Sequence, residues 1–273
     1  MDDWLKGLAI GLFGLIVFHD GLMKFGGHAI ARRVRQNVGS SAGQIRAQIY
    51  PRGLFGLFAQ DIHTLRVQAS GIDVKRLPFT LSTLHGRQGK IRFLEVRFSD
   101  VTWVHLPVRR LEAVIPSAGY DADQAFRHQR LVLSRADPGF ATVRVDTDGL
   151  EAFLARKYRT LLSDVKVYLP RERLRLEGTI VLLGSRSHLL AEGRLAHREG
   201  RYVDVVDATL WVNRAPVSEG TAQALLRRFN PILDLKADLG IHRIFTINTL
   251  EIEDGLLVMR GPFVIAGSEE QTL

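Results

Sequence analysis

The 273-residue sequence contains no cysteine. Disulfide bonds, zinc–thiolate sites and thiol nucleophiles are therefore excluded, and the redox compartment is left open. The nine histidines show neither the H-x-x-x-H nor the H-E-x-x-H spacing, and the P-loop, G-x-G-x-x-G and G-x-S-x-G motifs are also missing. We accordingly expect no catalytic residues, no metal site and no cofactor, and we expect that the protein is not an enzyme.

One pair of residues keeps a catalytic alternative open. His63 follows Asp61 by two residues at the expected start of a strand, where the carboxylate could orient the imidazole as a general base. A partly exposed histidine in a turn explains the same two residues more simply. A hydrolase is therefore only the third hypothesis for the function.

Long hydrophobic runs are also lacking. The longest uncharged and mostly apolar stretch, residues 7–18, has 12 residues, whereas a membrane-spanning helix needs about 20. Trp4 suits a membrane interface, and Arg32, Arg33 and Arg35 suit phospholipid headgroups. We expect residues 1–38 to form an apolar and amphipathic helix that contacts a membrane. The alternative is that this helix packs on an apolar surface of its own domain.

Acidic residues are fewer than basic ones, 29 against 37, which gives a net charge of +8. An excess of positive charge favours anionic partners, either phospholipid headgroups or nucleic acid. The basic residues are spread along the whole chain, and no basic run is interleaved with aromatic residues as in single-stranded nucleic-acid platforms. We expect a phospholipid membrane, and no nucleic acid, as the partner.

Strand-like alternation dominates the sequence from residue 43 onward. Apolar and polar residues alternate over 45–49 and recur in later segments, with changes of phase within 91–98 and within 201–213 that suggest bulges. Asp254–Gly255 is the strongest hairpin turn signal. We expect residues 39–273 to form one α+β domain, in which a long, bulged antiparallel sheet curls around helices and buries one face.

Two helices are expected between the strands. The first, 148–164, opens with Asp148 and Glu151 at the spacing of a capping box, and the second is 218–231. Lys157 falls on the apolar stripe of the first helix, so we expect it either to extend outward or to meet an anion.

Three stretches of the sequence together resemble a known family. They are "YPRGLFGLFAQDIHTLRVQASGI", then "TVRVDTDGLEAFLARK" with "LSDVKVYLPRERLRLEGTI", and finally "FNPILDLKADLGIHRIFTINTLEIEDGLLVMRG". Their order and spacing resemble the LmeA-like family of bacterial phospholipid-binding proteins over roughly residues 40–262. The resemblance implies an elongated sheet wrapped around helices, as in the tubular lipid-binding folds. It also implies an apolar groove for acyl chains, a location at the cell envelope and no assigned chemistry.

The leading hypothesis is a non-enzymatic, membrane-associated protein of the cell envelope that binds or transfers phospholipid, with a bound phospholipid or fatty acid as its only ligand. The expected acyl-chain contacts are large apolar residues, namely Ile45, Ile49, Leu54, Phe55, Leu57, Phe58, Leu150, Phe153, Leu154, Leu225, Leu226 and Phe229. The expected headgroup or membrane contacts are Trp4, Arg32, Arg33, Arg35 and Lys157. The alternative is a scaffold that binds another envelope protein and carries no ligand, because the same apolar residues would also form an ordinary filled core.

Overall fold

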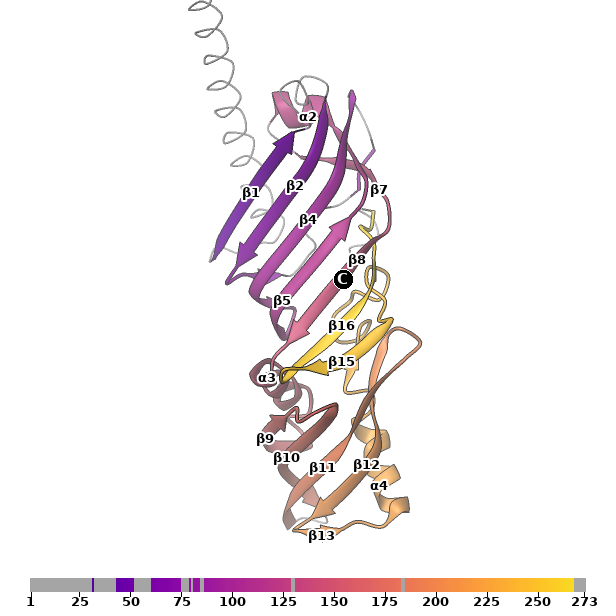
Figure 1. Ribbon diagram of the computed structural model, residues 1–273. Helices are drawn as coiled ribbons and strands as arrows, with labels where there is room; N and C mark the ends of the chain where they lie inside the picture. Colours follow the sequence, from indigo (N-terminus) through magenta and orange to yellow (C-terminus); the bar gives the residue numbers. More distant parts are fainter. Residues whose placement is uncertain are drawn as a thin grey trace, which may run out of the picture.

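The computed structural model describes residues 31, 43–51, 60–74, 79, 81–83, 86–128, 131–182 and 185–267. These residues form a mostly β protein with few helices, in which two sheets lie end to end along an elongated molecule (Figure 1). The expectation of a strongly curled, mainly antiparallel sheet is confirmed. The helix expected over residues 1–38 lies outside the described residues except for Ala31. None of the helices that the structure describes is both long and apolar enough to cross a bilayer.

Most strands belong to the first sheet, whose main path runs β1-β2-β4-β5-β8-β16-β15. Its strands are β1 (Gln44–Pro51), β2 (Asp61–Ser70), β3 (Asp73–Val74), β4 (Gln88–Trp103), β5 (Leu106–Ile115), β6 (Ala118–Asp121), β7 (Leu133–Ala136), β8 (Gly139–Val145), β15 (Thr249–Glu253) and β16 (Leu256–Phe263). Neighbouring strands are antiparallel, except that β2 and β3 run parallel to β4. Alternation in a sequence indicates which face of a strand is buried but not the direction of its neighbour, so the parallel pairs were not predicted.

The second sheet follows the order β13-β12-β11-β10-β9, and β14 pairs with β12 beside this path. Its strands are β9 (Leu162–Tyr168), β10 (Arg173–Leu182), β11 (Ser185–Arg198), β12 (Tyr202–Val212), β13 (Ala215–Pro216) and β14 (Leu233–Asp234). The chain then returns to the first sheet, where β16 pairs with β8. The expected single long sheet is thus divided into two, with β11 of one packed against β15 of the other.

Within the described ranges, three helices accompany these sheets: α2 (Ala122–Arg127), α3 (Thr147–Lys157) and α4 (Glu219–Phe229). The sequence did not predict α2. It also placed the cap of α3 wrongly, because Asp146 is the N-cap residue and accepts a hydrogen bond from Gly149 N at 2.8 Å. The helix ends at Lys157 rather than continuing to 164, because the segment from Leu162 alternates and pairs with β10.

The two expected bulges have different outcomes: the pairing of β4 shows no register shift within 91–98, whereas the pairing of β12 shows one within 201–213. Burial switches from Ile91 to Leu94 at the point where β4 exchanges β6 for β5 as its antiparallel neighbour. In 201–213, the pairing of β12 with β11 shifts register, and Asp207 has a φ of 50°. The turn at Asp254–Gly255 joins β15 to β16, and both of its residues have positive φ, as a type I′ turn requires.

Gly261 of β16 lies so close to a neighbouring backbone segment that no side chain fits there. A Cβ atom added there would lie 1.8 Å from the carbonyl oxygen of Thr246, whose N–H donates to Pro262 O. We predict that Gly261→Ala lowers the free energy of unfolding by about 3 kcal/mol, because two hydrogen-bonded backbone segments must separate. Urea denaturation measures this loss.

Gly220 of α4 provides the control for Gly261, because an added Cβ would meet nothing within 4 Å. Gly220→Ala is expected to raise the free energy of unfolding by about 0.5–1 kcal/mol, since alanine restricts the unfolded chain and favours helix. The same small change in the free energy of unfolding for both variants would contradict the close backbone approach at Gly261.

Candidate functional site

The predicted acyl-chain contacts of α3 form the junction between the two sheets. Leu150, Phe153 and Leu154 are at most 3% exposed. Helix α3 packs on β5 of the first sheet and on β9 of the second. The apolar side chains of α3 are therefore buried against the protein's own strands.

The predicted contacts of α4 lie elsewhere, on the second sheet. Leu225, Leu226 and Phe229 are half-buried, and α4 packs on β12. One contact joins the ends of α3 and α4: the rings of Tyr158 and Phe229 meet edge-on, with their centroids 5.3 Å apart. The two helices thus come together at their C-terminal ends only, and not along a shared groove.

The remaining predicted contacts are separated from both helices or lie outside the described residues. Ile45 and Ile49 are on β1, at the opposite edge of the first sheet from the junction with the second (Figure 1). The described residues therefore do not gather into one lining. The predicted contacts that lie outside the described residues are Trp4, Arg32, Arg33, Arg35, Leu54, Phe55, Leu57 and Phe58.

The concave face of the first sheet holds a small apolar cavity, which the sequence did not predict. Its free volume is about 10 Å³, room for about one water molecule. The residues that line it, all apolar, are Phe79, Val96, Phe98, Trp103, Leu111, Ile115, Phe263 and Ile265. Five of them come from β4 and β5 and one from β16, whereas Phe79 and Ile265 lie outside the strands.

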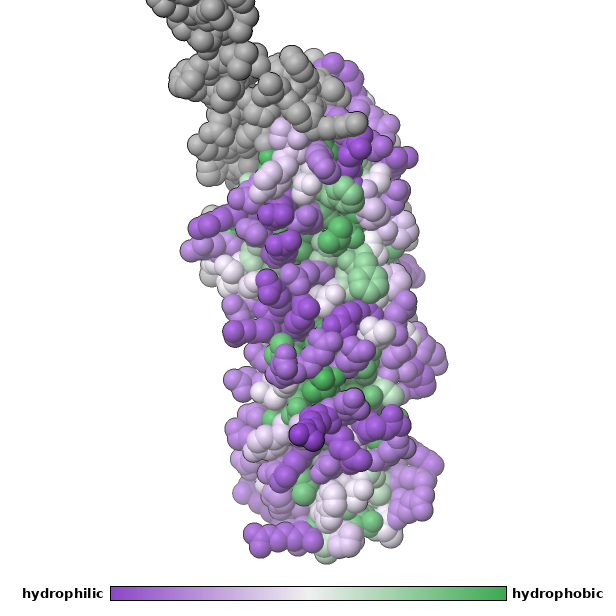
Figure 2. Space-filling view, viewed as in Figure 1, coloured by the Kyte–Doolittle hydropathy of each residue, from purple (hydrophilic) through white to green (hydrophobic). Residues whose placement is uncertain are grey.

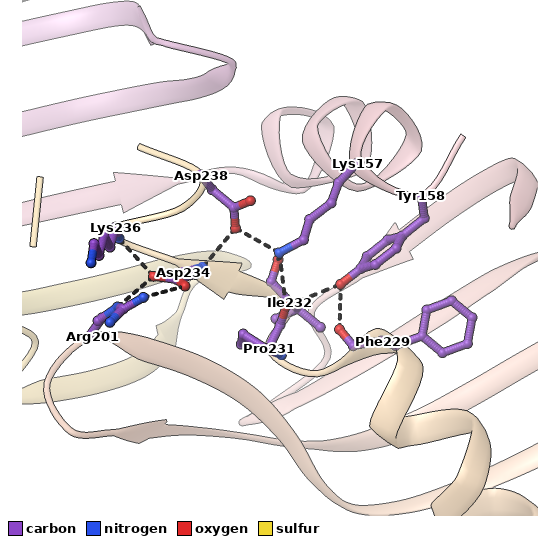
Figure 3. Close-up of polar contacts among 9 residues, drawn as sticks. All are labelled: Lys157, Tyr158, Arg201, Phe229, Pro231, Ile232, Asp234, Lys236 and Asp238. Atoms are coloured by element: carbon purple, nitrogen blue, oxygen red, sulfur yellow. Dashed lines mark hydrogen bonds and ion pairs between the residues drawn. The ribbon is translucent and has the colours of Figure 1, made fainter. Parts of the chain in front are cut away.

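Lys157 directs its ammonium group from the end of α3 into the segment 229–238 (Figure 3). Its Nζ donates to the carbonyl oxygens of Pro231 and Ile232, at 2.9 and 3.2 Å, and to Asp238 Oδ2 at 2.7 Å. Of the two outcomes expected for Lys157, an outward path or contact with an anion, the structure shows the second, and the anion is Asp238. Because these three contacts match the three ammonium protons, we do not propose Lys157 as a headgroup contact.

Tyr158, the next residue, completes this network. Its hydroxyl group donates to the carbonyl oxygen of Phe229 and lies 3.3 Å from that of Pro231 (Figure 3). Burial, and then the negative charge of Asp238, raise the pKa of Tyr158. The phenol is thus a neutral hydrogen-bond donor at physiological pH.

Arg201 and Asp234 form a second, bidentate pair beside this network. Arg201 Nε and a terminal nitrogen donate to the two carboxylate oxygens of Asp234, at 2.7 and 2.8 Å. The hydrogen bond from Arg201 lowers the pKa of Asp234 to about 2, with further help from the backbone N–H of Lys236. Asn230 also bonds to backbone, exchanging two hydrogen bonds with Val205. The side chains of Asn230, Asp234 and Asp238 in the motif "NPILDLKAD" are therefore bonded within the protein, where they fix the path of the chain.

His63 and Asp61, the residues of the catalytic alternative, face other groups. Asp61 Oδ1 lies 3.6 Å from Arg92 Nε, and the ring centroid of His63 lies 5.6 Å from that of Phe93. Within the described ranges, no three histidine or acidic side chains are grouped so that they could hold a metal ion. These contacts add no support for a hydrolase.

Comparison with protein-family models, with curated proteins and with solved structures finds no match for this chain. The resemblance to the LmeA-like family therefore stays a prediction that depends on its three sequence stretches.

Proposed function

We propose that this chain is a non-enzymatic phospholipid-binding or lipid-transfer protein of the cell envelope, with an architecture like that of the tubular lipid-binding folds. The observation that carries the proposal is the apolar cavity on the concave face of the curled first sheet. Large apolar and aromatic side chains surround it, as an acyl chain requires, and the resemblance of the three sequence stretches points to the same ligand.

The acyl chain enters by displacing side chains, because a free volume of about 10 Å³ holds about one water molecule. Phe79 and Ile265 are the side chains that move in this proposal, since they line the cavity but belong to segments outside the strand ladder. Val96, Phe98 and Leu111 stay fixed in the ladder of β4 and β5 and form the floor.

A scaffold with a filled core is the second candidate, and the tight packing of the interior favours it. Leu150, Phe153 and Leu154 are buried against the protein's own strands. In this alternative the cavity is an ordinary packing defect, and the protein acts through its surface on another envelope protein.

The fluorescence of Trp103 can distinguish the phospholipid-binding protein from the scaffold, because Trp103 lines the cavity. We predict that phospholipid co-purifies with the full chain and is detected by mass spectrometry of an organic extract. We also predict that phospholipid with brominated acyl chains quenches the fluorescence of Trp103 in a Trp4→Phe/Trp211→Phe variant.

The matched control retains Trp211 in a Trp4→Phe/Trp103→Phe variant. Trp211 is on β12 of the second sheet, away from the cavity, so its emission is expected to be unchanged by brominated chains. Absence of co-purifying phospholipid together with unquenched Trp103 would favour the scaffold instead.

A further inference from the structure

The outer face of the first sheet has an unusual arrangement of side chains. On β2, β4, β5 and β8, each inward residue is buried and the residues between them point to the opposite, convex face. The strand register places Gln68 beside both Arg46 and Arg97, and Ser99 beside both Ser70 and Arg110. The two serines thus lie side by side, and Ser99 has Arg110 as its other neighbour.

These residues line an open polar hollow of about 280 Å³ on the surface, which we call the arginine hollow. It is lined by residues of four strands, including Arg46, Gln68, Ser70, Arg97, Ser99 and Arg110. Arginine guanidinium and serine hydroxyl groups are donors that bind phosphate oxygens. Because Ser70 and Ser99 are short, they leave room for a phosphate group between the arginines.

The charges around the arginine hollow do not balance. Glu95 is shared by Arg66 and Arg97, at 2.8 and 3.3 Å. Glu112 is shared in the same way by Arg110 and Arg144, at 3.3 and 2.8 Å. Four arginines thus share two carboxylates, and Arg46 contacts the amide oxygen of Gln44 at 3.5 Å. The positive excess at this part of the face favours an anion.

Apolar side chains lie on the same face, farther along β4 and β5 and on the neighbouring strand β8. Phe93, Val114 and Phe140 are 40%, 47% and 51% exposed, and Val114 pairs directly with Phe140 across β5 and β8. We call these three residues the apolar cluster. Figure 2 shows hydrophobic surface over this part of β4, β5 and β8, with hydrophilic surface beside it. Val114 is four residues from Arg110, which corresponds to about 13 Å along the strand.

We propose that the outer face of the first sheet docks on an anionic phospholipid bilayer. The arginine hollow holds a lipid phosphate, and the apolar cluster enters the interface between headgroups and acyl chains. A soluble phosphate would occupy the hollow but leave three exposed apolar side chains in water, whereas a bilayer satisfies both. This inference rests on the proposed phospholipid function and adds the orientation in which the protein meets its membrane.

The absence of cysteine makes a direct test possible, because one introduced cysteine is the only thiol in the chain. We expect an environment-sensitive dye on Val114→Cys to shift its emission to the blue with vesicles of 70% phosphatidylcholine and 30% phosphatidylglycerol. The same dye on Val181→Cys, in the second sheet and 65% exposed, is the control and should not shift. A dye on Val114→Cys that stays in water while the chain binds these vesicles would overturn the proposal.

The arginine hollow is tested by vesicle co-sedimentation of the full chain. We expect Arg46→Gln/Arg97→Gln/Arg110→Gln to bind the anionic vesicles about 10- to 100-fold more weakly than the wild type, from the usual contribution of a basic residue near such a surface. The control Arg159→Gln/Arg186→Gln/Arg227→Gln removes the same charge from exposed arginines outside this face and should change binding by much less. Equal losses in both triple variants would contradict the proposal.

Two further outcomes distinguish the ligands. Binding of glycerol 3-phosphate at the hollow without vesicle binding would overturn docking on a bilayer. Loss of vesicle binding in the first triple variant, with no phospholipid in the interior and no quenching of Trp103, would retain the docking surface and refute the acyl-chain cavity.

Discussion

Replacement of Lys157 by methionine is expected to lower the free energy of unfolding by about 2–3 kcal/mol. Methionine keeps most of the apolar stem but removes the ammonium group. Asp238 and the carbonyl oxygens of Pro231 and Ile232 then lose their shared donor. The pair is only 21% and 17% exposed, so water compensates poorly for this loss. Urea denaturation at neutral pH measures the effect.

Lys166 is the matched control, because it pairs with Glu151 at a similar distance, 2.9 Å, but is 61% exposed. Lys166→Met should therefore leave stability nearly unchanged. A double-mutant cycle of Lys157→Met with Asp238→Asn should also show strong coupling. Equal small losses for the two lysine variants would mean that Lys157 does not hold the segment 229–238.

The second large effect that we predict is a loss of folding stability at acidic pH. Asp234 has its pKa lowered to about 2 by the hydrogen bond from Arg201, against an ordinary value of 3.8. A carboxylate with a lowered pKa contributes stability that is complete above its unfolded pKa and is lost as the pH falls through its folded pKa. Because Arg201 is partly exposed and screened, we expect this contribution to be about 1–2 kcal/mol at pH 7. It should fall to about half near pH 3 and to about one sixth at pH 2, and it should disappear only below that pH.

The measurement is the difference in unfolding free energy between the wild type and Asp234→Asn at several pH values from 7 to 2. We expect the difference to narrow below about pH 4, because asparagine does not titrate. Asp207→Asn serves as the control: Asp207 also pairs with an arginine, Arg194, but is 64% exposed. A difference for Asp234→Asn that stays constant down to pH 2 would show that Arg201 does not favour the ionised carboxylate.

The sequence predicted the features of this fold that depend on near neighbours. Alternation identified the buried face of β1 and β2, and the Asp254–Gly255 turn identified the last hairpin. These signals are local, because the alternation of apolar and polar residues in a strand can be recognised within a few consecutive residues. The partners of each strand are set by distant residues. The parallel pairing of β2 with β4 and the division into two sheets therefore had no signal in one sequence.

The candidate site shows the same limit more sharply. The position of Lys157 on an apolar stripe correctly required an outward path or an anion, but not that the anion would be Asp238, far along the chain. The arginine hollow gave no signal at all, because its three arginines come from β1, β4 and β5 and only the register brings them together. The apolar side chains of α3 looked the same as ligand contacts or as core, since both are buried by the same force.

The return of the chain to the first sheet has a consequence for synthesis on the ribosome. Strand β16 lies between β8 and β15, although about 110 residues, which include the whole second sheet, separate β8 from it in the sequence. Until residue 263 has been translated, β8 keeps an unpaired edge that can pair with other chains. The second sheet can form first, so the sheet that begins earlier in the sequence is completed last.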